Sequence, residues 1–384
     1  MARDIFTIHA DGTGEVAVVV HPADDYPIGY TRDGRLLFAS DRSGTFDLWS
    51  IPVSAASDRP WPPKQIRPNL GIVQPLAVIN TGVIYYTQSQ CSADVLRVPL
   101  TSTVDAMPGA VTPVATRFVT YNSGPDWSPS GNELVYQVGK PGSPDGIQLA
   151  FVSILDGQES VIHPDLLQFS RPRYLPDGNS VVVHGVGLDS VQGVYRIDRQ
   201  TGKATLVVHS EGQDLANPAP LADALFFESG DNSVKVLRRG SETPETVFQS
   251  ATRNANFNSA PSPDGTSIAV VDGSSLIVVR IGELGREVLS LASPEQFHPF
   301  PGSLAWTADG RYILFAKVVG RERQVWRIPA RGGRAEPIGL SVRDQALYFL
   351  RTSGDGRNLA FVTGDCDLRP REVWALENFL PLLE

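Results

Sequence analysis

Short apolar runs that alternate with turn residues recur along the whole chain. A small polar pair, most often Asp-Gly, precedes each run, as Asp264-Gly265 precedes Ile268–Val270 and Asp309-Gly310 precedes Ile313–Phe315. Such runs are typical of half-buried β-strands. Asp-Gly suits a tight turn because glycine accepts a positive φ and aspartate tolerates one. Each pair therefore predicts a hairpin turn in which the aspartate is structural.

The turns recur at a nearly constant spacing. Their second residues, at intervals of 42–49 residues, are Gly34, Gly82, Gly131, Gly178, Asp223, Gly265, Gly310 and Gly356. Further strand patterns follow each turn, such as Gln324–Ile328 and the short outer run Ala204–Val208. No amphipathic helix pattern is visible. Four antiparallel strands per repeat predict an all-β protein of the β-propeller type, because stacked blades bury faces that one blade cannot.

Eight turns predict eight four-stranded blades, and seven blades are the alternative because the second and fifth repeats are degenerate. Such a ring uses nearly all of the 384 residues, so we expect one propeller domain over residues 1–384. Strands from both termini are expected to close the ring, since closure removes exposed edges. We expect Glu15–Val20 to complete the blade that begins near Gln345, and either Ile5–Ile8 or Val373–Leu376 to be surplus.

Composition narrows the classes of partner and compartment. The formal charge of −9 argues against nucleic acid and anionic membrane surfaces. Cys91 and Cys366 form neither a disulfide framework nor a zinc motif. No run of 18 apolar residues predicts membrane insertion. No export signal is recognised at Met1, which leaves the compartment open: cytoplasmic for the sequence as it stands, periplasmic or extracellular if a signal or anchor was removed. We expect a monomer.

Several repeats carry a phrase of a known family. The segments Trp127–Gly131, Ser262–Gly265 and Ala39–Gly44 resemble the WD-like repeat of bacterial TolB-type propellers, and the closing segment Glu372–Pro381 resembles the end of such propellers. The resemblance implies the propeller fold for nearly the whole chain. No residues remain for the separate N-terminal domain of TolB, so its binding role is not implied.

Motifs for catalysis are missing from the sequence. There is no Gly-x-Ser-x-Gly nucleophile elbow and no phosphate-binding glycine loop. The six histidines lack the spacing of a metal motif. We therefore expect no catalytic residue, metal or cofactor. Calcium bound by the turn Asp11–Gly14 is a less favoured alternative to a plain turn.

The loops that lead into the first strand of each blade hold large or charged residues, and such loops carry function on a rigid scaffold. The candidate ligand- or partner-binding residues are Tyr26, Tyr121, Asn122, Arg171, Arg173, Phe257, His298 and Arg343. An aromatic and arginine-lined rim suits a peptide, a small carboxylate or a carbohydrate acid. The alternative is that these side chains only pack between blades.

These observations favour a non-catalytic binding or scaffold propeller that recognises a protein or peptide partner at the channel mouth. Two alternatives stay open. One is a lyase or hydrolase that acts on a carbohydrate or small molecule in the central channel. The other is the sensor propeller of a longer membrane-linked protein.

Overall fold

The computed structural model describes residues 4–21, 23, 25–40, 42–43, 46–53, 62–68, 70, 73–79, 83–88, 93–100, 109–114, 121–139, 147–210, 215–251, 257–273, 275–282, 285–292, 303–364 and 372–377. Strands and turns make up this part of the chain, and no helix occurs in it. The all-β prediction is therefore confirmed. Among the same residues there is no helix with the length and apolar character that a membrane crossing requires.

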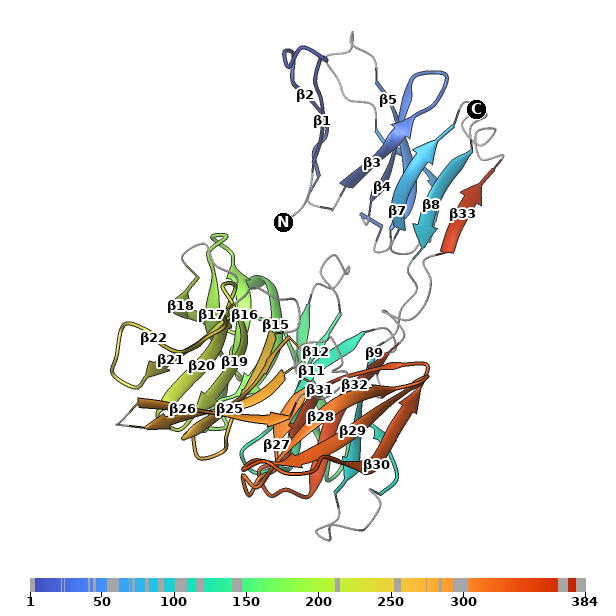
Figure 1. Ribbon diagram of the computed structural model, residues 1–384. Coiled ribbons are helices and arrows are strands. Elements are labelled where there is room, and N and C mark those ends of the chain that lie inside the picture. Colours follow the sequence, from blue (N-terminus) through green and yellow to red (C-terminus); the bar gives the residue numbers. More distant parts are fainter. Residues whose placement is uncertain are drawn as a thin grey trace. The chain divides into compact units, whose positions relative to one another are not determined.

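Contacts divide the chain into two compact units (Figure 1). Unit 1 comprises Met1–Cys91, Lys140–Gly146 and Arg369–Glu384, and unit 2 comprises Ser92–Gly139 and Ile147–Leu368. Each unit is described by itself. Compact units of one chain can fold together, so the single domain over residues 1–384 stays a prediction.

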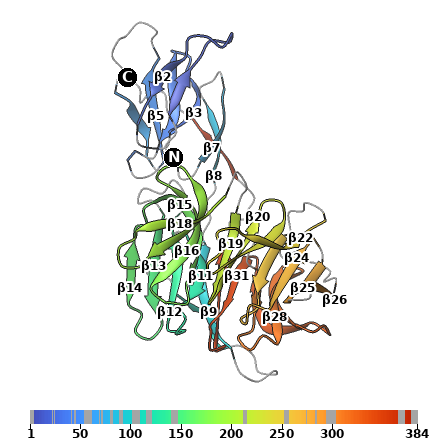
Figure 2. The ribbon, with the colours of Figure 1, turned by 90° about the vertical axis from the view of Figure 1, so that its left-hand side faces the viewer.

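The described strands of unit 2 form six antiparallel sheets of four strands each (Figures 1 and 2). Five sheets use consecutive strands: β11 (Asn122–Trp127), β12 (Glu133–Val138), β13 (Gln148–Ser153) and β14 (Glu159–Ile162); β15 (Leu166–Tyr174), β16 (Ser180–Gly187), β17 (Gln192–Asp198) and β18 (Ala204–His209); β19 (Leu215–Leu221), β20 (Ala224–Ser229), β21 (Ser233–Arg238) and β22 (Glu245–Gln249); β23 (Phe257–Pro261), β24 (Ser267–Asp272), β25 (Ser275–Gly282) and β26 (Gly285–Ala292); and β27 (Leu304–Trp306), β28 (Tyr312–Val319), β29 (Glu322–Pro329) and β30 (Glu336–Arg343).

The sixth sheet of unit 2 combines strands from distant parts of the sequence. Its order is β31 (Ala346–Thr352), β32 (Asn358–Gly364), β9 (Ala93–Pro99) and β10 (Thr112–Pro113). Strands β32 and β9 pair along their full length, from Asn358 opposite Pro99 to Gly364 opposite Ala93. Two segments separated by more than 250 residues therefore share one sheet.

This sheet corrects the predicted closure. Glu15–Val20 does not complete the blade that begins near Gln345, because β2 (Val16–Val19) pairs with β1 (Ile5–Thr7) instead. The place beside β32 belongs to β9, whose Val95 and Val98 are fully buried in two apolar clusters with residues of β31 and β32. Burial of β9 from both sides accounts for the pairing.

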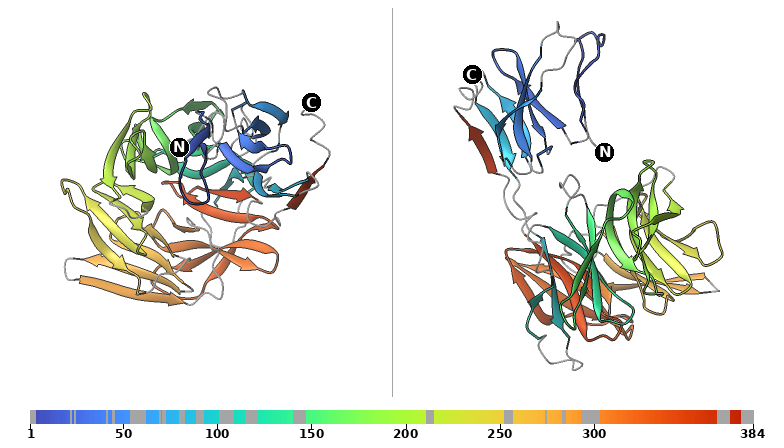
Figure 3. Two further views of the ribbon diagram at one scale, coloured as in Figure 1. Left: turned by 90° about the horizontal axis from the view of Figure 1, so that it is seen from above. Right: turned by 180° about the vertical axis from the view of Figure 1, so that it is seen from behind.

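Apolar clusters lie between neighbouring sheets of unit 2. One contains Phe151 and Val183 and joins the β11–β14 sheet to the β15–β18 sheet. Four more link the following sheets in chain order, and another links the sixth sheet back to the β11–β14 sheet. The first strands of neighbouring sheets also contact one another, in the cycle β11, β15, β19, β23, β27 and β31. These six strands therefore surround a common centre (Figure 3).

Unit 1 has sheets of the same kind. Strands β3 (Asp25–Tyr30), β4 (Arg35–Ser40), β5 (Asp47–Pro52) and β6 (Lys64–Arg67) form a four-stranded sheet, and β7 (Val73–Val78), β8 (Ile84–Gln88) and β33 (Glu372–Leu376) form a three-stranded one. Leu37, Ile84 and Leu376 belong to the cluster between them. The described strands thus give eight blade-like sheets over two units, and the single ring of eight blades stays a prediction.

The Asp-Gly turns are confirmed as hairpin turns. In the turn before β24, the N–H of Gly265 donates to the carbonyl of Ser262 at 2.9 Å, and Gly265 has a φ of 71°. The Asp264 carboxylate accepts the N–H of Thr266 at 3.0 Å and the hydroxyl of Ser262 at 2.5 Å. This aspartate fixes the local backbone, as its exposed position in a tight turn predicts.

Candidate functional site

A repeated distortion shapes the centre of unit 2. Four of the six first strands contain a register shift, at Ser123/Asp126, Ser170/Arg173, Ala216/Ala219 and Tyr348/Arg351. Each shift contains one residue in the left-handed region, and these residues are Gly124 (φ 64°), Arg171 (55°), Asn217 (50°) and Phe349 (57°). A bulge redirects the side chains that follow it. Three of the bulges are followed by a charged residue: Asp126, Arg173 and Arg351.

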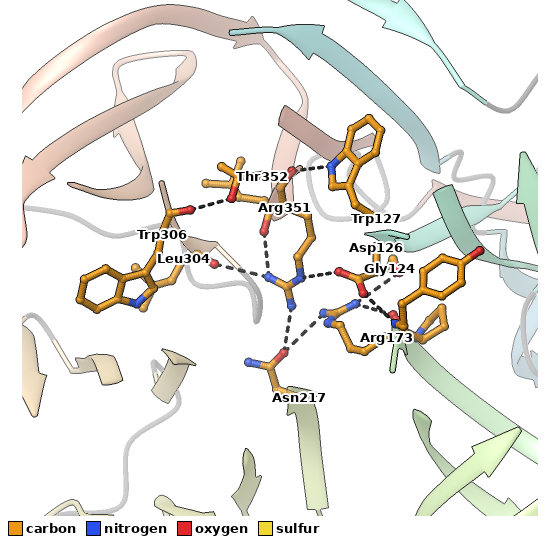
Figure 4. Close-up of polar contacts among 12 residues, drawn as sticks. Gly124, Asp126, Trp127, Arg173, Asn217, Leu304, Trp306, Arg351 and Thr352 are labelled. Carbon is orange, nitrogen blue, oxygen red and sulfur yellow. Dashed lines mark hydrogen bonds and ion pairs between the residues drawn. The ribbon is translucent and has the colours of Figure 1, made fainter. Parts of the chain in front are cut away.

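These three side chains converge at the centre (Figure 4). Nε of Arg351 lies 3.8 Å from Oδ1 of Asp126. The Asp126 carboxylate also accepts the backbone N–H of Tyr174 at 2.8 Å. Arg351 donates through Nη1 to the carbonyl of Leu350 at 2.8 Å. Charges from β11, β15 and β31, three strands far apart in sequence, thus meet in one polar cluster.

Arg173 is the most deeply buried of the described arginines, with 3% of its surface exposed. Its Nη1 donates to the carbonyl of Pro172 at 2.7 Å and approaches that of Gly124 at 3.5 Å. Its Nη2 lies 3.5 Å from Oδ1 of Asn217. The buried Nε has no acceptor among the described residues. One donor of a buried guanidinium is therefore unused.

A second carboxyl group completes the cluster. Oε1 of Glu228, on β20, accepts the hydroxyl of Ser259 at 2.8 Å and Nδ2 of Asn217 at 3.1 Å. Oδ1 of the same Asn217 accepts Nη2 of Arg351 at 3.3 Å. Asn217 therefore links the buried glutamate to the arginines. Its left-handed backbone is one that asparagine tolerates better than most residues.

Burial shifts the pKa values in the cluster. It raises the pKa of Asp126, although the positive charges of Arg173 and Arg351 oppose this shift. It also raises the pKa of Glu228, although the positive charge of Arg171 opposes that shift. Burial also lowers the pKa of Arg173, and the positive charge of Arg351 lowers it further. The cluster holds three guanidiniums and two carboxyls. Its formal charge is therefore positive, which is unfavourable in a desolvated interior.

Half-buried aromatic residues lie beside the cluster. Cζ of Arg171 is 5.9 Å from the centroid of the Phe349 ring. The buried Nη1 of Arg171 has no acceptor in the described part of the chain. Tyr121 and Phe349 pack against the same apolar cluster. Together, Tyr121, Arg171 and Phe349 form what we call the rim.

The structure brings together part of the predicted set. Tyr121 directly precedes β11, Asn122 begins it, and Arg171 and Arg173 lie on β15. Asn122 is fully buried. Three of these residues lie on two first strands that contact each other, and Tyr121 lies directly before one of them.

The other predicted residues lie elsewhere. Phe257 begins β23 and stacks on Phe248, with 6.1 Å between the ring centroids. Tyr26 lies on β3 of unit 1. Arg343 ends the outer strand β30, where its exposed side chain pairs with Glu322 at 3.3 Å. His298 lies outside the described residues.

Four members of the cluster were not predicted: Asp126, Asn217, Glu228 and Arg351. The sequence contains a signal for two of them. In three repeats a charged residue lies five positions before the turn glycine: Asp126, Arg173 and Arg351. A charge that recurs at one position of a propeller repeat marks a ring of side chains at one depth of the channel. Asn217 and Glu228 carry no such signal.

Two observations concern metal ligands. Oδ1 of Asp11 accepts both the N–H and the hydroxyl of Thr13, at 3.0 and 2.7 Å, which is the bonding of a plain turn. Within the described ranges, no group of three or more His, Cys, Asp or Glu side chains has the geometry to hold a metal ion.

Comparisons with known proteins identify the fold. No protein-family model matches the chain, and no curated protein matches it. Among solved structures, the putative TolB from Agrobacterium tumefaciens aligns with a TM-score of 0.54 at 14% identity, over 71% of this chain and 98% of that one. TolB from Acinetobacter baumannii aligns with a TM-score of 0.48 at 14% identity, over 92% and 81%. At such low identity, the first likeness shows the fold alone, and the chain has a TolB-like β-propeller fold.

Proposed function

We propose that the chain is a non-catalytic binding propeller that takes a protein or peptide partner at the mouth of the channel in unit 2. The convergence of charged side chains from β11, β15 and β31 beside the rim carries this proposal. Aromatic rings and arginines are the side chains that contribute most to protein interfaces. A rigid array of first strands holds them in place, so that little conformational entropy is lost on binding.

We also propose that the binding ring is the six sheets of unit 2, closed where β9 pairs with β32. The cycle of apolar clusters and the cycle of contacts between first strands support a six-bladed ring. The single ring of eight blades expected from the repeats is the alternative to this six-bladed ring. In the described register β33 pairs with β8, from Glu372 opposite Gln88 to Leu376 opposite Ile84.

The bonding of the two carboxyl groups favours binding over catalysis. Asp126 is held by the N–H of Tyr174 and by Arg351. Oε1 of Glu228 accepts hydrogen bonds from Asn217 and Ser259. A general base needs a carboxylate that can reach and take a proton from a substrate. Both groups instead serve as fixed partners for buried donors.

The test is selection of peptides from a displayed random library on the immobilised full chain. Peptides that are enriched are then labelled, and their affinity is measured by fluorescence anisotropy. We expect Tyr121→Ala and Arg171→Ala to weaken binding at least tenfold. Arg343→Ala, whose side chain is exposed on the outer strand β30, is the matched control and should bind like the wild type.

Two results would overturn this function. One is that no enriched peptide binds saturably to the wild-type chain. The other is that Tyr121→Ala and Arg171→Ala bind every enriched peptide as tightly as Arg343→Ala does, which would move the interface away from the rim.

A further inference from the structure

The arginine cluster has more buried positive charge than its own carboxyl groups can balance. Arg171, Arg173 and Arg351 carry three positive charges, against Asp126 and Glu228. Burial raises the pKa of both carboxyls. Protonation of either one would enlarge the excess. A desolvated excess charge is unfavourable unless a counter-charge is bound.

Unused hydrogen-bond donors lie in the same place. Nε of Arg173 belongs to a side chain with only 3% of its surface exposed, and it has no acceptor among the described residues. Nη1 of Arg171, two residues earlier on the same strand, is buried and also lacks one. Leaving a buried donor unsatisfied costs about 1–3 kcal/mol, and more for a charged group. An anionic oxygen is the acceptor that suits such charged donors best.

We propose that this cluster is a subsite for one carboxylate group of the bound peptide, seated between Arg171 and Arg173. A carboxylate matches the planar donor fork of arginine. Its single negative charge balances the formal excess of one, whereas a phosphate dianion would overshoot it. The subsite rests on the proposed peptide-binding function and names the group that the channel recognises.

The backbone at Arg171 supports a role for its side chain. A non-glycine residue at a φ of 55° occupies a sparsely populated region, which costs about 1–3 kcal/mol. The neighbouring first strand uses Gly124 at the corresponding point of its bulge, at a φ of 64°. Glycine is thus compatible with this bulge. Retaining arginine there has a conformational cost that binding by its guanidinium explains.

The experiment compares the thermal stability of the full chain in sodium acetate, sodium phosphate and sodium chloride at equal ionic strength. If acetate binds with a Kd of about 10 mM, 100 mM acetate should raise the wild-type Tm by about 3–6 °C over chloride. Arg171→Gly should fold, because glycine suits the bulge, and should lose this rise. Arg343→Ala is the control and should keep it.

A second measurement identifies the source of the carboxylate. Three peptides compete with bound acetate, followed by saturation-transfer NMR: acetyl-trialanine as the free acid, its C-terminal amide, and acetyl-Ala-Asp-Ala-amide. Displacement by the free acid alone assigns the subsite to a peptide C-terminus. Displacement by the aspartyl peptide assigns it to an acidic side chain, and displacement by neither leaves a free small carboxylate as the ligand.

Failure of the subsite can be distinguished from failure of the function. An equal Tm in acetate and chloride, a preference for phosphate, or an acetate effect that survives Arg171→Gly overturns the subsite. The library-derived peptides would then still bind at the rim if the function holds. If no peptide binds but acetate acts through Arg171, the subsite is real and the peptide function is wrong.

Discussion

Replacing Asp126 by asparagine removes one negative charge from the arginine cluster and little else. The asparagine side chain keeps an oxygen that can accept the N–H of Tyr174, a bond of 2.8 Å in the wild type. Oδ1 of Asp126 lies 3.8 Å from Nε of Arg351, and the two side chains are 18% and 15% exposed. The substitution therefore isolates the counter-charge of a largely buried ion pair.

The expected loss follows from that geometry. Two unit charges at this distance attract by about 4 kcal/mol at an effective dielectric constant of about 20. Removing one partner of a buried pair typically costs about 3–5 kcal/mol, because the other charge stays buried. Two effects bring the loss below this range, to about 2 kcal/mol: the partial exposure of Asp126 and Arg351, and the desolvation of the Asp126 carboxylate that raises its pKa. For a unit of this size, that corresponds to a Tm decrease of about 4–8 °C.

Thermal unfolding of the full chain, followed by circular dichroism, is the assay. Asp309→Asn is the matched control, because Asp309 pairs with Arg311 at the surface, where the side chains are 46% and 75% exposed. Exposed pairs contribute about 0–1 kcal/mol, so its Tm should change by less than about 4 °C. Equal shifts for Asp126→Asn and Asp309→Asn would refute the view that Asp126 is a buried counter-charge.

The remaining predictions concern ring closure and acid stability. Asp94 and Thr363 are direct partners across β9 and β32. When both are replaced by cysteine in a chain whose two native cysteines are serine, the pair should form a disulfide on mild oxidation. A chain that stays reduced, as measured by mass spectrometry, would contradict the closure. The Ser262 hydroxyl and the Thr266 N–H lower the pKa of Asp264, so its stabilising effect is complete above the unfolded pKa of about 3.9 and is lost as the pH falls through the lower folded pKa. Asp264→Asn keeps the acceptor without titrating, so its Tm should fall less steeply than that of the wild type below pH 4, and parallel Tm profiles would contradict this.

The turns could be predicted from the sequence because their chemistry is local. Asp264 bonds to Ser262 and Thr266, all within five residues. Gly265 supplies the positive φ that the turn requires. The recurrence of this turn motif also predicted the propeller fold, because the spacing of the turns sets the number of residues in a blade.

The closing strand could not be predicted in the same way. Ala93–Pro99 and Glu372–Leu376 both show the alternation of a half-buried strand, and that alternation tells which face is buried but not which strand is the neighbour. Consecutive strands usually pair, which favours β9 beside β8 and β33 beside β32. The structure exchanges the two: β9 pairs with β32, and β33 pairs with β8. Only long-range packing of Val95 and Val98 distinguishes the arrangements.

The sequence predicted only the site residues that resembled a loop leading into a blade. Arg171 and Arg173 were expected in such a loop, although both lie on β15, whereas Arg351 lies within an apolar strand and Glu228 lies on a second strand. Their convergence depends on the bulges, and a bulge is a property of pairing between strands. The equal spacing from the turn glycine places residues 126, 173 and 351 at one level of their repeats. That their side chains turn towards one centre follows only from the register.

The bulges connect the fold to the proposed chemistry. Extended strands alternate their side chains between two faces, so a regular first strand would present its charges to the apolar packing between blades. The bulge at Arg171 turns the strand, and Arg173 then faces the Asp126 and Asn217 side chains instead of a neighbouring blade. The same device brings in Arg351. The first strands of unit 2 therefore have a left-handed backbone at four points, and they bring the positive charges of Arg173 and Arg351 together at the proposed carboxylate subsite.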